Sequence, residues 1–296
     1  MYQDFYGLTA KPFSLTPDPA YFYGTSSHAN ALELVRHGLR QRVGVMTLTG
    51  ISGAGKTTLC RTILQLGNDT FERSTFTSLV LNPYLTADEL LQVILQDFGV
   101  ISREEAGAGR LAQVSSQDLL RTLHDFLRSL LPLGAAAVLI VDEAQKLSLP
   151  MLQQLQRLAG LTENGRPLLQ ILLVGQLGLK DVLRNPAVAA LASQISIRYR
   201  LRALAPDETA AYVAHRLQVA GAVEPDLFTS RALHAVHRSS RGNPRLINLM
   251  CERALQAGFA EGHPVVDAEL VLRAAAGLGL APSDGVLSWF RRVAAL

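Results

Sequence analysis

Apolar residues along this chain recur with two different periods, and the change between them divides the chain into an α/β part and an all-helical part. Five runs predict strands, at 43–48, 76–81, 135–141, 169–175 and 195–201. The runs 135–141 and 169–175 are almost uninterrupted in apolar character, which is typical of strands buried on both faces of a parallel sheet. The run 195–201 alternates apolar and polar residues and predicts a half-buried strand.

Segments whose apolar residues recur every three or four positions lie around these runs and after them. Those around the runs predict helices, at 26–39, 59–64, 86–98, 116–131 and 149–161. Because strands alternate with helices, we expect an α/β fold with a three-layer parallel sheet. After residue 208 the helix-like segments continue without further strand-like runs, and they predict helices at 209–220, 225–237, 244–260 and 267–276. A small all-helical domain is therefore expected to follow the sheet.

Turn signals complete the predicted organisation. An aromatic and proline-rich segment with a helix is expected at 1–40, before an α/β core at 41–204. A helical domain at 205–280 then precedes an amphipathic tail at 281–296. Between residues 101 and 113 the periodic pattern gives way to Gly and Ala, which predicts a surface loop.

Composition is typical of a folded protein from a reducing compartment. Of the 296 residues, 48 % are hydrophobic and 18 % are charged, which excludes extended disorder. The formal net charge of +3 is too small to require a nucleic-acid partner, although it allows a local basic surface. The two cysteines, Cys60 and Cys251, lie far apart in helical patterns, so we expect buried thiols and find no zinc-site spacing.

No secretion signal or membrane span is predicted, so we expect a cytoplasmic protein. The first residues lack a basic and then apolar signal pattern, and no run of about 18 apolar residues occurs. Residues 286–296 combine apolar bulk with Arg291 and Arg292. They fit a helix that contacts the inner face of the membrane or a partner, a tail that packs on its own domain, or a chain cut short before a membrane span.

One phosphate-binding motif carries most of the predicted chemistry. Residues 50–57 read G-x-x-x-x-G-K-T between a predicted strand and a helix, the context in which this motif binds a nucleoside triphosphate. Its glycines let successive backbone N–H groups surround the phosphates at the positive end of the helix. Lys56 is expected to reach the β- and γ-phosphates, and the Thr57 hydroxyl to bind Mg²⁺. The loop is predicted to hold ATP through Gly50, Gly53, Ala54, Gly55, Lys56, Thr57 and Thr58.

Two carboxylates end the apolar run 135–141 and suggest the second half of the site. In phosphoryl transfer, Asp142 would hold Mg²⁺ and Glu143 would polarise the attacking water. For such a pair taken alone, a solvated strand end is the alternative interpretation. In a chain that also carries the complete loop, we interpret the pair as a Walker B motif and expect an ATPase.

A sheet domain followed by a helical lid resembles the P-loop AAA+ architecture, which clasps nucleotide between the two parts. This resemblance suggests two further site residues. Gln176, just past the strand 169–175, occupies the place of sensor 1, a polar group that orients the water. Arg245 opens a lid helix, the place of the sensor 2 arginine, whose planar guanidinium clamps phosphate oxygens. For either residue, the alternative is a polar side chain that merely ends an element.

Several motifs together resemble a narrower group, the ExeA/GspA-type AAA+ ATPases, over roughly residues 1–280. The resemblance rests on the aromatic opening, the phosphate-binding loop, Asp142-Glu143-Ala144-Gln145, Gly242-Asn243-Pro244-Arg245, and segments at 28–39, 173–176 and 208–217. It implies a homo-oligomer with ATP at subunit interfaces that assembles or remodels a protein partner complex, in secretion or envelope assembly. Because such proteins are related to ATPases that regulate DNA transposition, an ATP-dependent regulator that binds duplex DNA is the alternative.

Two departures from this family change the expectation. The family usually has arginines shortly before its fifth strand, whereas residues 189–195 contain none. If one of those arginines completes a neighbouring active site, hydrolysis here relies on another arginine, or is slow enough that the protein is a nucleotide-gated scaffold. Of Arg184, Arg198 and Arg200 we favour Arg198, the alternative being that alternating arginines cover the exposed face of the strand. We also expect that this chain lacks the membrane span and the peptidoglycan-binding region of longer members.

Basic residues recur at helical spacing in the predicted lid. Arg231, His234, Arg238, Arg241 and Arg245 lie three or four residues apart and predict a basic ridge. The ridge is either a solvated helix face or a contact for an acidic neighbouring subunit or a nucleic-acid backbone.

Overall fold

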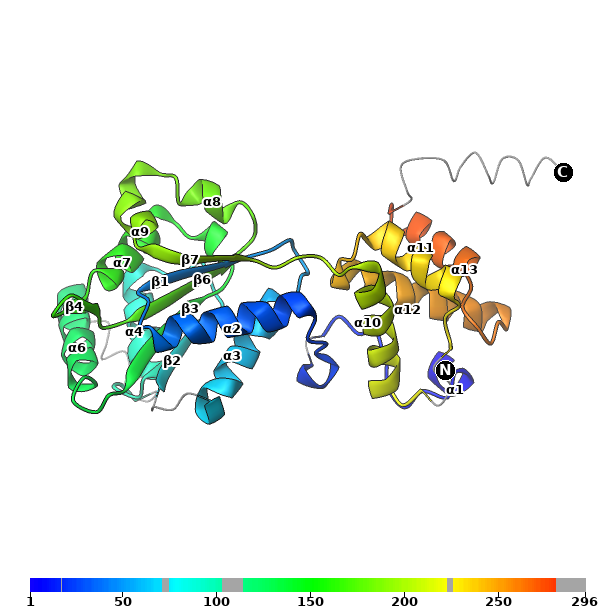
Figure 1. Ribbon diagram of the computed structural model, residues 1–296, viewed down its shortest axis with the longest axis horizontal. Coiled ribbons are helices and arrows are strands. Elements are labelled where there is room, and N and C mark those ends of the chain that lie inside the picture. Colours follow the sequence, from blue (N-terminus) through cyan, green and yellow to red (C-terminus); the bar gives the residue numbers. More distant parts are fainter. Residues whose placement is uncertain (17, 71–74, 103–113, 223–225, 281–296) are drawn as a thin grey trace. The chain divides into compact units, whose positions relative to one another are not determined.

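The chain forms two compact units, which are described separately below. The computed structural model describes residues 1–16, 18–70, 75–102, 114–222 and 226–280 (Figure 1). One unit comprises residues 26–201, and the other combines residues 1–25 with the chain from residue 202 onward. The predicted segment 1–40 therefore contributes to both units. The predicted tail at 281–296 and most of the predicted loop at 101–113 lie outside the described residues.

A five-stranded parallel sheet forms the centre of the first unit, as the alternation of strands and helices predicts. Its strand order is β2-β3-β6-β1-β7. The strands are β1 (Val45–Thr49), β2 (Thr75–Val80), β3 (Ala136–Val141), β6 (Gln170–Gly175) and β7 (Ile195–Arg200). Because β6 pairs with both β3 and β1, the carboxyl ends of these three strands are neighbours at one edge of the sheet.

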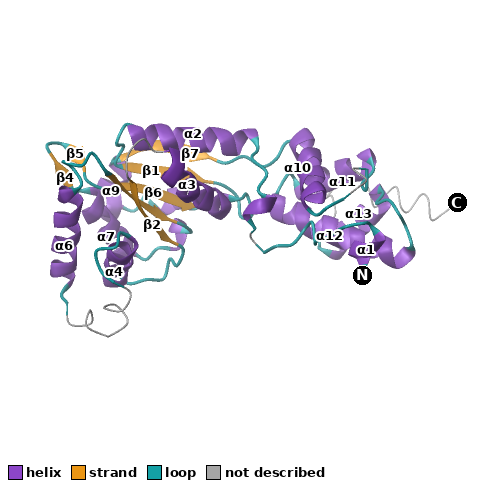
Figure 2. Cartoon of the chain, turned by 90° about the horizontal axis from the view of Figure 1, so that it is seen from below, coloured by secondary structure: helices purple, strands orange, loops and turns teal. Residues whose placement is uncertain are grey.

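Helices cover both faces of this sheet and give the three predicted layers (Figure 2). One face carries α2 (Ser26–Arg40) and α3 (Lys56–Thr70), and the other carries α4 (Ala87–Asp97), α6 (Ser116–Ser129) and α7 (Leu149–Ala159). Successive residues of β3 belong to opposite cores: Val138 and Ile140 to one, Leu139 and Val141 to the other. All four are buried, which explains the uninterrupted apolar run in the sequence.

Several short elements show no period in the sequence because each has too few residues. They are the hairpin of β4 (Thr162–Glu163) and β5 (Arg166–Pro167), α8 (Leu179–Val182), η4 (Pro186–Val188) and α9 (Ala189–Ser193). Asn164 and Gly165, between β4 and β5, have φ angles of 52° and 74°. An Asn-Gly pair with two positive φ angles is the typical turn of a two-residue hairpin, so this element was detectable from its turn residues.

The second unit is helical, as predicted. Its main helices are α10 (Pro206–Val219), α11 (Ser230–Ser240), α12 (Pro244–Glu261) and α13 (Ala268–Gly277), with α1 (Tyr2–Phe5) and η1 (Pro19–Tyr21) packed against them. The helix expected from residue 225 begins at Ser230, because the Thr229 hydroxyl accepts a hydrogen bond from the Ala232 backbone N–H at 3.1 Å and caps it. No helix in the described part of the chain combines the length and apolar character that membrane crossing requires.

A buried arginine fixes the N-terminal segment to the helical unit. The Arg216 side chain, on α10, donates hydrogen bonds to the carbonyl oxygens of Pro12 and Ser14. Its guanidinium also lies 4.6 Å from the centre of the Tyr21 ring. A planar group with five donors suits this task, because it can satisfy several carbonyls of a segment that has little regular secondary structure.

Candidate functional site

Three of the segments predicted to carry chemistry meet at the carboxyl edge of the sheet. The phosphate-binding loop follows β1, Asp142 and Glu143 follow β3, and Gln176 follows β6. The Gly50 backbone N–H donates to the Gly175 carbonyl at 3.2 Å, which joins the start of the loop to the end of β6. The parallel order of the strands therefore brings residues far apart in the sequence to one place.

The loop has the backbone conformation that its glycines predict, and a buried histidine supports it. Gly53 and Gly55 have φ angles of 79° and 84°, which residues with a Cβ atom rarely adopt. His28, on α2, is 5 % exposed, and its Nε2 atom lies 3.1 Å from the Ala54 carbonyl oxygen. A Cβ atom on Gly55 would come within 2.9 Å of the same Nε2 atom. The histidine therefore packs directly against the second half of the loop.

Lys56 is buried against its own loop. The side chain is 5 % exposed, and Nζ donates hydrogen bonds to the carbonyls of Gly50 at 3.2 Å and Ile51 at 2.9 Å. Burial lowers the pKa of the Lys56 ammonium, although the carboxylates of Glu143 and Asp142 act in the opposite direction. The phosphate-binding loop therefore fixes the direction of the Lys56 ammonium group.

Thr57 and Asp142 form a direct contact between the loop and β3. The Thr57 hydroxyl donates to Asp142 Oδ2 at 2.5 Å, and Asp142 Oδ1 accepts the Glu143 backbone N–H at 2.8 Å. Asp142 is 2 % exposed. A hydroxyl and a carboxylate are hard oxygen ligands, and Mg²⁺ is usually held by one or two such groups together with substrate phosphates, so these residues fit a magnesium ion. The described residues contain no cluster of three or more His, Cys, Asp or Glu for a metal held by side chains alone.

Glu143 has an unusual backbone conformation, and its side chain contacts two neighbouring residues. Its φ and ψ angles, 52° and 32°, are left-handed. Its Oε2 atom accepts a hydrogen bond from Gln145 Nε2 at 2.8 Å and forms an ion pair with Lys146 Nζ at 3.0 Å. Burial alone would raise the pKa of the Glu143 carboxyl, but the contacts with Lys146 and Gln145 outweigh it, and the pKa lies below its usual range. The carboxylate is therefore ionised at neutral pH.

The predicted sensor and finger residues have different surroundings. Gln176 is half-buried at the end of β6, and its backbone N–H donates to Gln145 Oε1 at 2.8 Å. Arg198, exposed on the edge strand β7, donates to the carbonyls of Ala192 at 3.2 Å and Ile195 at 3.3 Å. Arg198 thus contacts the end of α9. Arg245 is exposed in the first turn of α12, in the helical unit, and its role stays a prediction.

The two other finger candidates are surface residues. Arg184 pairs with Asp181 at 2.9 Å, with both side chains largely exposed. Arg200 is exposed and lies beside Thr49, at the carboxyl ends of β7 and β1. None of these contacts identifies a finger, because a finger acts on a neighbouring subunit.

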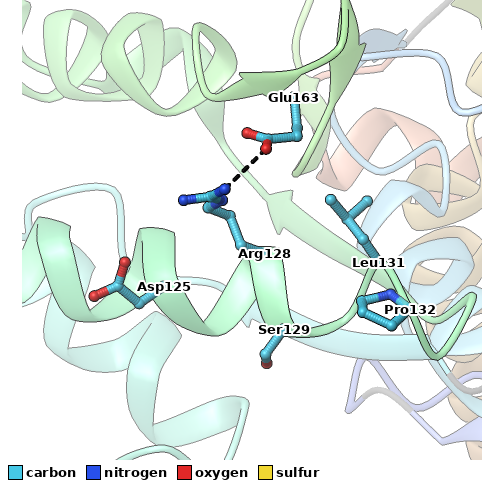
Figure 3. A pocket seen from close by; sticks show the side chains of 6 residues that line it. All are labelled: Asp125, Arg128, Ser129, Leu131, Pro132 and Glu163. Carbon is cyan, nitrogen blue, oxygen red and sulfur yellow. Dashed lines mark hydrogen bonds and ion pairs between the residues drawn. The ribbon is translucent and has the colours of Figure 1, made fainter.

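A separate pocket lies away from these residues. It has a volume of about 460 Å³ and lies between the end of α6 and the β4–β5 hairpin. The ion pair of Arg128 and Glu163, 2.9 Å long, crosses it (Figure 3). The lining residues precede β3 and β6, so the pocket belongs to the amino edge of the sheet, opposite the phosphate-binding loop.

Comparison with known proteins agrees with the fold and with the family resemblance of the sequence. Residues 39–183 match the family described as AAA domain. Over 275 residues, 93 % of this chain, the sequence is 42 % identical to General secretion pathway protein A of Aeromonas hydrophila. The chain is related to the GspA-type AAA+ ATPases. It spans 48 % of the length of that relative.

Solved structures share the fold of this chain at much lower sequence identity. ORC2 of Aeropyrum pernix, in ADPNP and ADP complexes, is 17 % identical with a TM-score of 0.63, and the match covers 90 % of this chain and 71 % of that one. Cdc6p of Pyrobaculum aerophilum is 18 % identical with a TM-score of 0.64, over 89 % and 69 % of the two chains. These similarities show the fold alone, a parallel sheet followed by helices.

Three residues near the site received no role from the sequence. His28 and Gln145 lie within segments that carry the family resemblance, and that position was the available signal. Lys146 directly follows Gln145, but lysine is common at protein surfaces, so the sequence held no signal for a role of this residue. Their contacts with the loop and with Glu143 become visible only in three dimensions.

We predict that Gly55→Ala weakens ATP binding by about tenfold or more, because alanine at a positive φ costs roughly 1–2 kcal/mol and its Cβ atom meets His28. Equilibrium titration with a fluorescent ATP analogue measures the effect. Gly99→Ala is the matched control, since Gly99 has a φ of 73° but open space around it. Equal loss of affinity in both variants would contradict the role of the His28 contact.

Proposed function

We propose that this protein binds Mg·ATP at the carboxyl edge of the sheet and hydrolyses it. The observation that carries the proposal is the contact between Thr57, in the phosphate-binding loop, and Asp142, at the end of β3. In this assignment the loop residues 50–58 hold the phosphates through backbone N–H groups, and Lys56 adds a positive charge. Bound Mg²⁺ would neutralise charge on the phosphates, held through Thr57 and Asp142.

In the same proposal, Glu143 polarises the attacking water. Its carboxylate is ionised and fixed by Gln145 and Lys146, and a base must be ionised and positioned to accept a proton. Gln176 would orient the water from the end of β6, and Arg245 would contact the nucleotide from the helical unit. For Arg245 the supporting facts are its exposure and its place in the first turn of α12.

We further propose that the protein acts as a homo-oligomer with ATP at subunit interfaces. Membership of the AAA+ family supports this, and Arg198 is the favoured residue to complete a neighbour's site. The name of the relative from Aeromonas hydrophila supports a role in secretion. We propose that the partner is a protein complex of secretion or of envelope assembly. The protein would then work in the cytoplasm, at the inner face of the membrane if its tail binds there. A slowly hydrolysing scaffold would use the same site.

A second candidate function, binding of duplex DNA, is favoured by the basic ridge. Arg231, His234 and Arg238 are exposed on one face of α11, and Arg241 is exposed directly after it. Within the described residues, no hydrogen bond or ion pair engages these four side chains.

The chain around the ridge also lacks acids. Residues 227–251 contain no Asp or Glu, so nothing nearby in sequence neutralises the ridge. Arg231 and Arg238 are about 10 Å apart along the helix, a length over which DNA presents several phosphates. Salt-sensitive binding without base specificity is the expected mode.

For the first function, we predict that Glu143→Gln retains ATP binding and lowers kcat by roughly 100-fold or more, because the base is lost. Lys56→Ala should instead abolish detectable ATP binding. Phosphate release and nucleotide titration measure the two effects. Glu163→Gln, which removes a carboxylate at the opposite edge of the sheet, is the control and should change neither. Unchanged kcat in Glu143→Gln would refute the assignment.

For the second function, we predict that the double variant Arg231→Ala/Arg238→Ala binds labelled duplex DNA about tenfold more weakly at low salt and with a smaller salt dependence. Fluorescence anisotropy with Mg·ATP present measures it. Arg121→Ala/Lys180→Ala removes the same charge from exposed sites elsewhere and serves as control. If wild type fails to bind DNA at low salt, or if the two double variants bind alike, the DNA function is wrong.

A further inference from the structure

The side chain of Gln145 joins the ends of two strands. Gln145 belongs to the 3₁₀ turn Ala144–Lys146 that follows β3 and Glu143. Its Nε2 group donates to Glu143 Oε2 at 2.8 Å, and its Oε1 atom accepts the Gln176 backbone N–H at 2.8 Å. One amide therefore connects the carboxylate at the end of β3 to the backbone at the end of β6.

The chemistry of the two partners determines the orientation of this amide. A carboxylate offers only acceptors and a backbone N–H offers only a donor. With the amide reversed, its oxygen would face the Glu143 carboxylate and its NH₂ group would face the Gln176 N–H. Both contacts would then be repulsive, so the bridge has one favourable arrangement.

Gly175 leaves the space that the bridge occupies. A Cβ atom on Gly175 would lie 2.6 Å from Gln145 Oε1 and 3.3 Å from the Gln145 backbone nitrogen. Gly175 does not have a positive φ, so backbone conformation is not what requires glycine here. The close approach of Gln145 explains the glycine.

Lys146, the second partner of Glu143, holds the carboxylate less firmly than Gln145 does. Lys146 has a side chain that is 45 % exposed, so water competes for its ammonium group. Gln145 instead is tied at both ends, to Glu143 and to the backbone at Gln176. Glu143 Oε2 carries both contacts, and Oε1 has no bonding partner among the described residues.

We propose that Gln145 is a positioning residue that fixes the Glu143 carboxylate to the end of β6. A shift of the β6 end at Gln176 then moves the carboxylate with it, so the two groups assigned to the attacking water keep one geometry. This inference rests on the proposed hydrolysis, in which Glu143 is the base.

Two substitutions distinguish the two hydrogen bonds of the bridge, the one to Glu143 and the one from the Gln176 backbone N–H. Gln145→Ala removes both hydrogen bonds. Gln145→Glu keeps an acceptor for the Gln176 N–H but replaces the donor to Glu143 by a second carboxylate. The matched control is Gln156→Ala, because Gln156 Oε1 accepts the Leu191 backbone N–H at 3.3 Å in the same unit, away from the site.

The first readout is hydrogen exchange at the Gln176 amide, which requires no turnover. We expect Gln145→Ala to speed this exchange by tenfold or more and Gln145→Glu to leave it near the wild-type rate. Gln156→Ala should leave it unchanged. Unaltered protection of Gln176 in Gln145→Ala overturns the bridge, whatever the rate of hydrolysis.

The second readout is steady-state ATP hydrolysis. Both Gln145 variants should lower kcat by roughly 10- to 100-fold, because a displaced base is inefficient, and should change the KM for ATP by less than about twofold. A wild-type kcat, a raised kcat, or a loss that appears only in KM overturns the positioning role. Equal turnover in wild type and Glu143→Gln would instead contradict the proposed function, while the exchange result would still decide whether the bridge exists.

Discussion

The site depends on one constraint, the pairing of β6 between β3 and β1. Because all three strands are parallel, their carboxyl ends lie at the same edge, and the residues that follow them meet there. Thr57 can reach Asp142 only in this arrangement, since the two residues belong to segments 85 positions apart. The hydrophobic cores on both faces of the sheet hold the strands in this register.

Charge within the site is balanced by short contacts rather than by solvent. Lys56 and Asp142 are both almost completely buried, and each has hydrogen-bond partners in the loop or next to it. Glu143 has a left-handed backbone, which costs free energy in a residue other than glycine. Such strain often accompanies function, and here the contacts with Gln145 and Lys146 hold the carboxylate in place.

Much of the fold was predictable because its signals are local. Apolar runs revealed the five strands, and the glycine pattern revealed the loop. The hairpin at β4–β5 was missed because it is too short for a period, although Asn164-Gly165 was a usable turn signal. The support of the loop by His28 and the bridge through Gln145 were not predictable, because each joins residues that only the sheet topology brings together. For Arg198, the sequence suggested a finger, whereas its visible contacts are with backbone carbonyls near α9.

We propose that Thr57 and Asp142 hold the metal of a bound Mg·ATP. Calorimetric titration of ATP with Mg²⁺ and with excess chelator, on wild type and on Thr57→Val, tests this assignment. We expect Mg²⁺ to tighten ATP binding to wild type about tenfold or more and to have little effect on ATP binding to Thr57→Val. Equal affinity of wild type for ATP with and without Mg²⁺, or an unchanged Mg²⁺ effect in Thr57→Val, would contradict it.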